Sequence, residues 1–220
     1  LCIIIWMEAK PREAAVNSLV VHPNVAINVE TSLRFAQKRR SSTRKPQTEC
    51  VRPRLSANMF KNDARVLIVC TGNTCRSAMA AFYLQWALEQ QGMFAARGLR
   101  AWSRGVAVDG GSCNPKALAA LRANGVPTGE AEQHVATQIS EADVAEASAI
   151  CVMTRGHRER LLLLYPGAVD KIHLLLSFSP ITFDEEISDP YGEAQERYDG
   201  CLALMKPALD TIAQWCRPAT

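Results

Sequence analysis

The chain has 220 residues, 48% of them hydrophobic and 21% charged, and a formal net charge of +3. This length suits one ordinary domain plus an appendage, and no apolar run approaches the roughly 20 residues of a membrane span. The charge is uneven: residues 1–63 carry +6 and residues 64–220 carry −3. We therefore expect neither a membrane anchor nor a nucleic-acid surface on the folded part.

The eight cysteines form no CxxC pair and no Cys/His zinc spacing; they are Cys2, Cys50, Cys70, Cys75, Cys113, Cys151, Cys201 and Cys216. This pattern predicts reduced thiols in a cytoplasmic protein without a metal. The four scattered histidines are interpreted as surface or core residues and not as ligands; they are His22, His134, His157 and His173.

Residues 1–63 show no sustained helical or strand period, and the stretch RFAQKRRSSTRKPQTECVRPR is basic and Ser/Thr-rich. We predict a disordered N-terminal extension before a folded domain at 64–220. Three interpretations stay open. The extension is a transit peptide, a binding tail, or a start-site artefact, and the last is favoured because Met59 lies just before the first predicted strand.

The first half of the domain alternates between strand and helix. Residues 65–70, RVLIVC, form an apolar β-branched run typical of a buried parallel strand, and residues 77–90 follow as an apolar-rich helix. Residues 99–106 suit a second strand. Asn114 and Pro115 predict the start of a second helix, which Gly125 closes.

The second half repeats this alternation. Residues 148–153 and 171–176 predict the third and fourth strands, with a helix over 155–164 between them. From Glu193 onward, apolar residues at 4-3-4-3-4 spacing predict a last helix, which Pro207 should kink or split. Alternating strands and helices predict a parallel sheet covered on both faces, with a ligand site where a strand ends and a helix begins.

Such a junction is the loop over residues 70–77, CTGNTCRS, which we call the phosphate loop. Curling it turns successive backbone N–H groups inward and makes an anion site, and the following helix adds its positive end. Arg76 can grip two phosphate oxygens with its planar guanidinium. The same positive field favours the thiolate form of Cys70, the predicted nucleophile.

The other residues of the phosphate loop have supporting parts. Gly72 allows a close backbone approach, Asn73 tolerates left-handed dihedrals and braces the loop, and Thr71 contributes a backbone N–H. Ser77 either donates to the thiolate or caps the helix. Cys75 either packs behind the loop or traps oxidised Cys70 as a disulfide.

A phosphate ester or phosphoramidate also needs a general acid for its leaving group. The motif ISDPYG over residues 187–192 supplies Asp189, whose apolar and aromatic surroundings favour the protonated form. Pro190 stiffens this turn, and Tyr191 is expected to form a wall of the pocket.

These motifs resemble the low-molecular-weight protein-tyrosine phosphatase family over residues 65–216. VLIVCTGNTCRS resembles its phosphate loop, ISDPYG its general-acid loop, and AICVMTRGHRERL its third strand and following helix. The resemblance implies a three-layer α/β/α fold with a four-stranded parallel sheet, phosphotyrosine phosphatase I-like. It also implies metal-independent, cofactor-free catalysis through a cysteinyl-phosphate that water hydrolyses, with Asp189 as base. Ala78 and Ala81 replace the usual Pro and acidic residue, so altered packing is expected there.

The expected substrate preference depends on Thr74, a position at which the tyrosine-directed members of this family commonly carry Ile or Leu. The protein-arginine phosphatase subgroup resembles this sequence more closely, and a polar Thr74 suits a phosphoguanidinium better than a phenyl ring. We therefore expect phosphoarginine in proteins as the substrate, with phosphotyrosine as the alternative. We also expect the protein to be a monomer. A thioredoxin-coupled arsenate reductase is the rival from another class, but it needs a relay of cysteines, and Cys113 is solitary while Cys151 lies in a strand.

Overall fold

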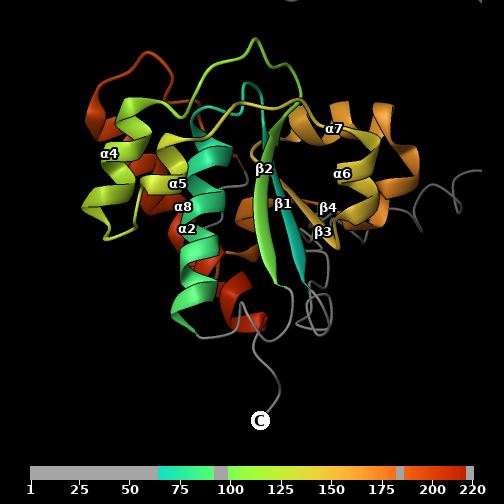
Figure 1. Ribbon diagram of the computed structural model, residues 1–220. Coiled ribbons are helices and arrows are strands. Elements are labelled where there is room, and N and C mark those ends of the chain that lie inside the picture. The colour runs from blue at the N-terminus through green and yellow to red at the C-terminus, as the bar shows by residue number, and fades with distance from the viewer. Residues whose placement is uncertain (1–63, 92–98, 182–185, 217–220) are drawn as a thin grey trace, which may run out of the picture. The chain divides into compact units, whose positions relative to one another are not determined.

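The computed structural model describes residues 64–91, 99–181 and 186–216 (Figure 1). The predictions for residues 1–63 therefore lie outside the described residues. Within the described part, no helix has the length and apolar character needed to span a membrane. All six cysteines in this part are free and buried.

Four parallel strands form one sheet in the order β2-β1-β3-β4. Their bounds are Arg65–Cys70 for β1, Arg100–Gly105 for β2, Ala149–Val152 for β3 and Ile172–Leu174 for β4. β1 pairs with both β2 and β3, so it is a central strand, as its nearly complete burial requires. The predicted four-stranded parallel sheet is confirmed.

Helices cover both faces of the sheet. Figure 1 shows α2 (Arg76–Gln90), α4 (Pro115–Ala123), α5 (Gly129–Glu132) and α8 (Gln195–Trp215) on one side, and α6 (Glu141–Glu146) and α7 (Arg155–Leu164) on the other. Alternate residues of β1 enter different cores: Val66 and Ile68 pack with the first group, Leu67 and Val69 with the second. This period of two confirms the three-layer arrangement.

The phosphate-loop helix and its neighbour begin where the sequence places them. α2 starts at Arg76, directly after the loop, and buries Ala78 and Ala81 in the core. α4 starts at Pro115, where the Asn114 side chain accepts a hydrogen bond from the Lys116 N–H at 2.9 Å. Gly125 has a φ of +75°, the left-handed conformation expected just after the end of a helix.

Three details differ from the sequence-based predictions. β4 ends at Leu174, and residues 175–178 form a 3-10 helix, η3 (Leu175–Phe178), so the predicted fourth strand is too long. Pro207 does not split α8, which is one helix. Its inner face packs completely, with Tyr198, Leu202, Met205, Leu209 and Ile212 all fully buried, and this burial outweighs the lost hydrogen bond. The helices α5 and α6 and the 3-10 helix η2 (Pro166–Lys171) were not predicted.

Candidate active site

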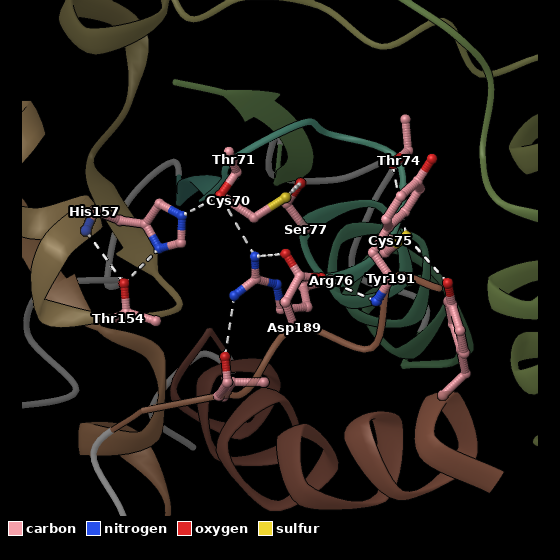
Figure 2. A network of polar contacts seen from close by, with 12 residues as sticks. Cys70, Thr71, Thr74, Cys75, Arg76, Ser77, Thr154, His157, Asp189 and Tyr191 are labelled. Carbon is pink, nitrogen blue, oxygen red and sulfur yellow. Dashed lines mark hydrogen bonds and ion pairs between the residues drawn. The ribbon is translucent and has the colours of Figure 1, made fainter. Parts of the chain in front are cut away.

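The phosphate loop lies at the carboxyl edge of the sheet, between the end of β1 and the start of α2 (Figure 2). A pocket of about 310 Å³ opens over it. Eight residues named from the sequence line this pocket: Cys70, Thr71, Gly72, Thr74, Cys75, Arg76, Asp189 and Tyr191. Asn73 and Ser77 are buried behind the loop instead. Ala107, Asp109 and Gly110 complete the lining, and the sequence analysis missed them.

Cys70 is almost completely buried, and its Sγ lies 3.0 Å from Ser77 Oγ. The direction of this contact follows from the neighbouring amide. Asn73 Nδ2, which can only donate, gives a hydrogen bond to Ser77 Oγ at 3.0 Å. The Ser77 hydroxyl proton is therefore available to Cys70 Sγ, an arrangement that stabilises a thiolate.

Asn73 braces the loop from behind. Its φ is +58°, and among the described residues it is the only non-glycine with a positive φ. Its Nδ2 also donates to Ser103 Oγ at 2.8 Å, and its Oδ1 accepts from the Thr137 N–H at 2.9 Å. One buried side chain thus ties the loop to α2, to β2 and to the segment after α5.

Arg76 is 4% exposed and is held from two sides (Figure 2). Nη1 donates to the carbonyl of Ile187 at 3.1 Å, and Nη2 forms an ion pair with Asp189 Oδ2. Nη2 also lies 3.5 Å from Thr71 Oγ1. Nε is buried and has no hydrogen-bond partner among the described residues. A buried, unsatisfied donor in a pocket that also holds a thiol fits an anion.

Asp189 sits at the rim of the pocket, with 46% of its side chain exposed. Its Oδ2 pairs with Arg76, and its Oδ1 accepts from the Tyr191 N–H at 3.2 Å. The loop that carries it is anchored to Met153, the residue after β3, by a hydrogen bond from the Ile187 N–H to the Met153 carbonyl at 2.9 Å. A carboxyl group, a thiol and a guanidinium therefore share one small pocket.

Comparison with known proteins identifies this arrangement. The family model described as "Low molecular weight phosphotyrosine protein phosphatase" matches residues 65–217. The chain belongs to this family.

The relatives include two kinds of phosphatase. A protein-arginine-phosphatase of Geobacillus stearothermophilus is 32% identical over 151 residues, which cover 68% of this chain and 94% of the relative. Low molecular weight protein-tyrosine phosphatase A of Mycobacterium tuberculosis is 30% identical, covering 68% and 90%. This chain is thus a low molecular weight phosphatase, and its family implies phosphoprotein substrates.

Solved structures of the family agree with this fold. The YwlE arginine phosphatase from G. stearothermophilus aligns with a TM-score of 0.58 and 32% identity, covering 69% of this chain and 91% of that one. A low molecular weight phosphotyrosine phosphatase from Vibrio cholerae aligns with a TM-score of 0.61 and 28% identity, covering 69% and 95%.

Two histidines of this phosphatase contact the phosphate loop, and the interpretation of them as surface or core residues did not predict these contacts. His134 Nε2 lies 2.8 Å from the Asn73 carbonyl, and His157 Nε2 lies 2.9 Å from Thr71 Oγ1. Burial and the nearby Arg76 lower the pKa of His157 to about 4. Neither contact could be read from the sequence, because the histidines lie 61 and 86 residues from their partners. His173 lies in β4, and His22 lies outside the described residues.

The remaining thiols near the loop are buried. Cys75 Sγ lies 3.6 Å from Tyr198 Oη and from Thr74 Oγ1, and burial raises its pKa. Burial also raises the pKa of Cys113 and of Cys201 to about 12. Because the thiolate is the reactive form, these surroundings favour packing for Cys75 and disfavour a thiol relay of the kind an arsenate reductase needs.

Gly105, at the end of β2, lies directly against the phosphate loop. A Cβ on this residue would lie 2.4 Å from the Thr71 carbonyl oxygen and 2.5 Å from Val108 Cγ2. We expect Gly105→Ala to displace the loop, lowering stability by about 1–3 kcal/mol and weakening phosphate binding. Thermal unfolding and phosphate titration check this, with Gly129→Ala as control because nothing lies within 4 Å of a Cβ there. A variant as stable and as tightly binding as the wild type would contradict it.

Proposed function

We propose that this phosphatase hydrolyses phosphoarginine in proteins, with Cys70 as nucleophile, Arg76 as phosphate ligand and Asp189 as general acid and base. The observation that carries the proposal is the composition of the pocket. Thr74, half-buried, lines it together with Asp109 and with the proposed acid, Asp189. An acidic, polar wall suits the cationic guanidinium of phosphoarginine better than the neutral ring of phosphotyrosine.

Substrate binding begins with an exchange of partners at Arg76. The incoming phosphate dianion takes the buried Nε and one Nη2 hydrogen, and the ion pair between Arg76 and Asp189 opens. Asp189 then faces a bound anion instead of a cation, which favours its protonated form. The pocket thereby prepares the acid only when a substrate is present.

In the first chemical step, the Cys70 thiolate attacks phosphorus on the side opposite the leaving group. An S–P bond forms, the P–N bond of phosphoarginine breaks, and Asp189 gives its proton to the departing nitrogen. In the second step, water attacks phosphorus while the Asp189 carboxylate takes its proton. The S–P bond breaks, which releases inorganic phosphate and restores the thiolate. Arg76 and the loop amides hold the phosphoryl oxygens throughout.

The substrate assignment is tested at Thr74. Peptides of one sequence carrying either phosphoarginine or phosphotyrosine are assayed by phosphate release near neutral pH. We expect the wild type to prefer phosphoarginine, and Thr74→Ile to shift the ratio of kcat/KM values toward phosphotyrosine by about tenfold, because the hydroxyl is lost and apolar area is gained.

Thr74→Val is the matched control, since it removes the hydroxyl and keeps the shape. If valine reproduces the shift, the hydroxyl carries the preference; if only isoleucine does, the added apolar area carries it. A wild type that prefers phosphotyrosine would overturn the assignment to phosphoarginine. If Thr74→Ile leaves the ratio of the two kcat/KM values unchanged, Thr74 does not determine the substrate preference.

A further inference from the structure

The ring of His157 bridges two hydroxyl groups that belong to different parts of the fold (Figure 2). Nδ1 lies 2.8 Å from Oγ1 of Thr154, the N-cap residue of α7, and Nε2 lies 2.9 Å from Oγ1 of Thr71 in the phosphate loop. His157 is 7% exposed, and its two hydroxyl contacts fix the orientation of the ring.

The known donors in this series of hydrogen bonds indicate which ring nitrogen of His157 carries the proton. The Arg76 guanidinium and the backbone N–H of His157 can only donate, so Thr71 Oγ1 accepts from Nη2 at 3.5 Å and Thr154 Oγ1 accepts at 3.2 Å. A hydroxyl that gives its own proton away becomes a better acceptor. The tautomer that best supports Arg76 therefore has its proton on Nδ1, with Nε2 accepting from the Thr71 hydroxyl.

A neutral ring fits this assignment. Burial and the charge of Arg76 lower the pKa of His157, while the carboxylates of Asp189 and Glu186 oppose this shift. Near neutral pH one ring nitrogen therefore donates and the other accepts, as the two hydroxyl contacts require.

We propose that His157 is a positioning residue for Arg76, acting through the hydroxyl of Thr71. This inference rests on the proposed function, in which Arg76 releases Asp189 when phosphate arrives. Nη2 has two protein partners, Asp189 and Thr71, so Thr71 is the one left after that release. With Ile187 holding Nη1, Thr71 fixes the other side of the guanidinium and leaves Nε for the phosphate.

The proposal predicts that Thr71→Val and His157→Phe each weaken the binding of inorganic phosphate by about tenfold, while the double variant is no weaker than either single one. Two residues that act through one hydroxyl cannot lose it twice. In turnover of p-nitrophenyl phosphate, KM should rise by a larger factor than kcat falls, because the contact between Ser77 and Cys70 remains. Dissociation constants for phosphate come from calorimetry, which needs no turnover.

Three further measurements separate the proposed role of His157 from a general loss of stability. His173→Phe makes the same change in β4, away from the loop, and should leave phosphate affinity unchanged. Thr71 is exposed, so its valine variant tests the proposal even if His157→Phe folds poorly. Nitrogen NMR of the wild type near neutral pH should show a proton on Nδ1 and a free, accepting Nε2, with the Nε2 signal shifting in Thr71→Val.

Two results would overturn the proposal: unchanged phosphate affinity in Thr71→Val, or additive losses in the double variant. If His157 of the wild type carries its proton on Nε2, or on both nitrogens, then Nε2 does not accept from the Thr71 hydroxyl, and the proposal is overturned as well. The proposed function would fail on a different observation, namely turnover that does not depend on Cys70. That observation would not change the phosphate affinities or the NMR result.

Discussion

Replacing Cys70 by serine is expected to lower kcat by on the order of a thousandfold or more while phosphate still binds. The substitution changes one atom, and Arg76 and the other residues that line the pocket stay unchanged. A serine hydroxyl at this position has no general base to activate it, because its neighbour Ser77 supplies a proton and does not take one. Nitrophenol release from p-nitrophenyl phosphate measures the loss, and calorimetry with inorganic phosphate measures the binding.

The matched control is Cys201→Ser, the same change at a thiol that does not line the active-site pocket. Burial raises the pKa of Cys201 to about 12, so it holds no thiolate near neutral pH, and its serine variant should keep normal turnover. If Cys70→Ser kept more than about one per cent of wild-type turnover, Cys70 would not be the nucleophile. If it lost phosphate binding as well, the substitution would have disturbed the loop rather than removed its chemistry.

The parts of the site that could be predicted from the sequence are the local ones. β1 is marked by an unbroken apolar run rich in β-branched residues. The phosphate loop is a stretch of neighbouring residues whose geometry follows from the strand before it and the helix after it. Asp189 was predicted from a separate motif and does reach the pocket, where it pairs with Arg76. This pairing was not predicted, because it depends on where the ISDPYG loop lies in the fold, and the loop is held there by the hydrogen bond from Ile187 to Met153.

The missed parts depend on which strands are neighbours. Ala107, Asp109 and Gly110 line the pocket because β2 lies beside β1. His157 reaches Thr71 because α7 follows β3 on the other side of β1. Hydrophobic periodicity predicts strands but not their order in the sheet. One missed element did leave a local signal: α6 begins with a capping box of Ser140 and Asp143, a pattern that marks a helix start.

The second large effect is expected for Asp189→Asn, which should lower kcat for phosphoarginine or phenyl phosphate by about 10²–10⁴-fold. Asparagine retains an oxygen for the Tyr191 N–H but has no proton of suitable acidity to give. The same variant should bind inorganic phosphate more tightly than the wild type. It cannot form the ion pair that occupies Arg76 in the free enzyme, and it removes a negative charge beside the incoming dianion.

The leaving group separates the two roles of Asp189. p-Nitrophenolate departs with little help from a proton, so Asp189→Asn should lose much less kcat with p-nitrophenyl phosphate than with phenyl phosphate. Asp109→Asn removes the same charge from another part of the pocket wall and should show no such dependence, because Asp109 donates no proton in the reaction. Equal losses of kcat on both esters in Asp189→Asn would show that it does not act as the acid. Weaker phosphate binding in that variant would show that its carboxylate does not compete for Arg76.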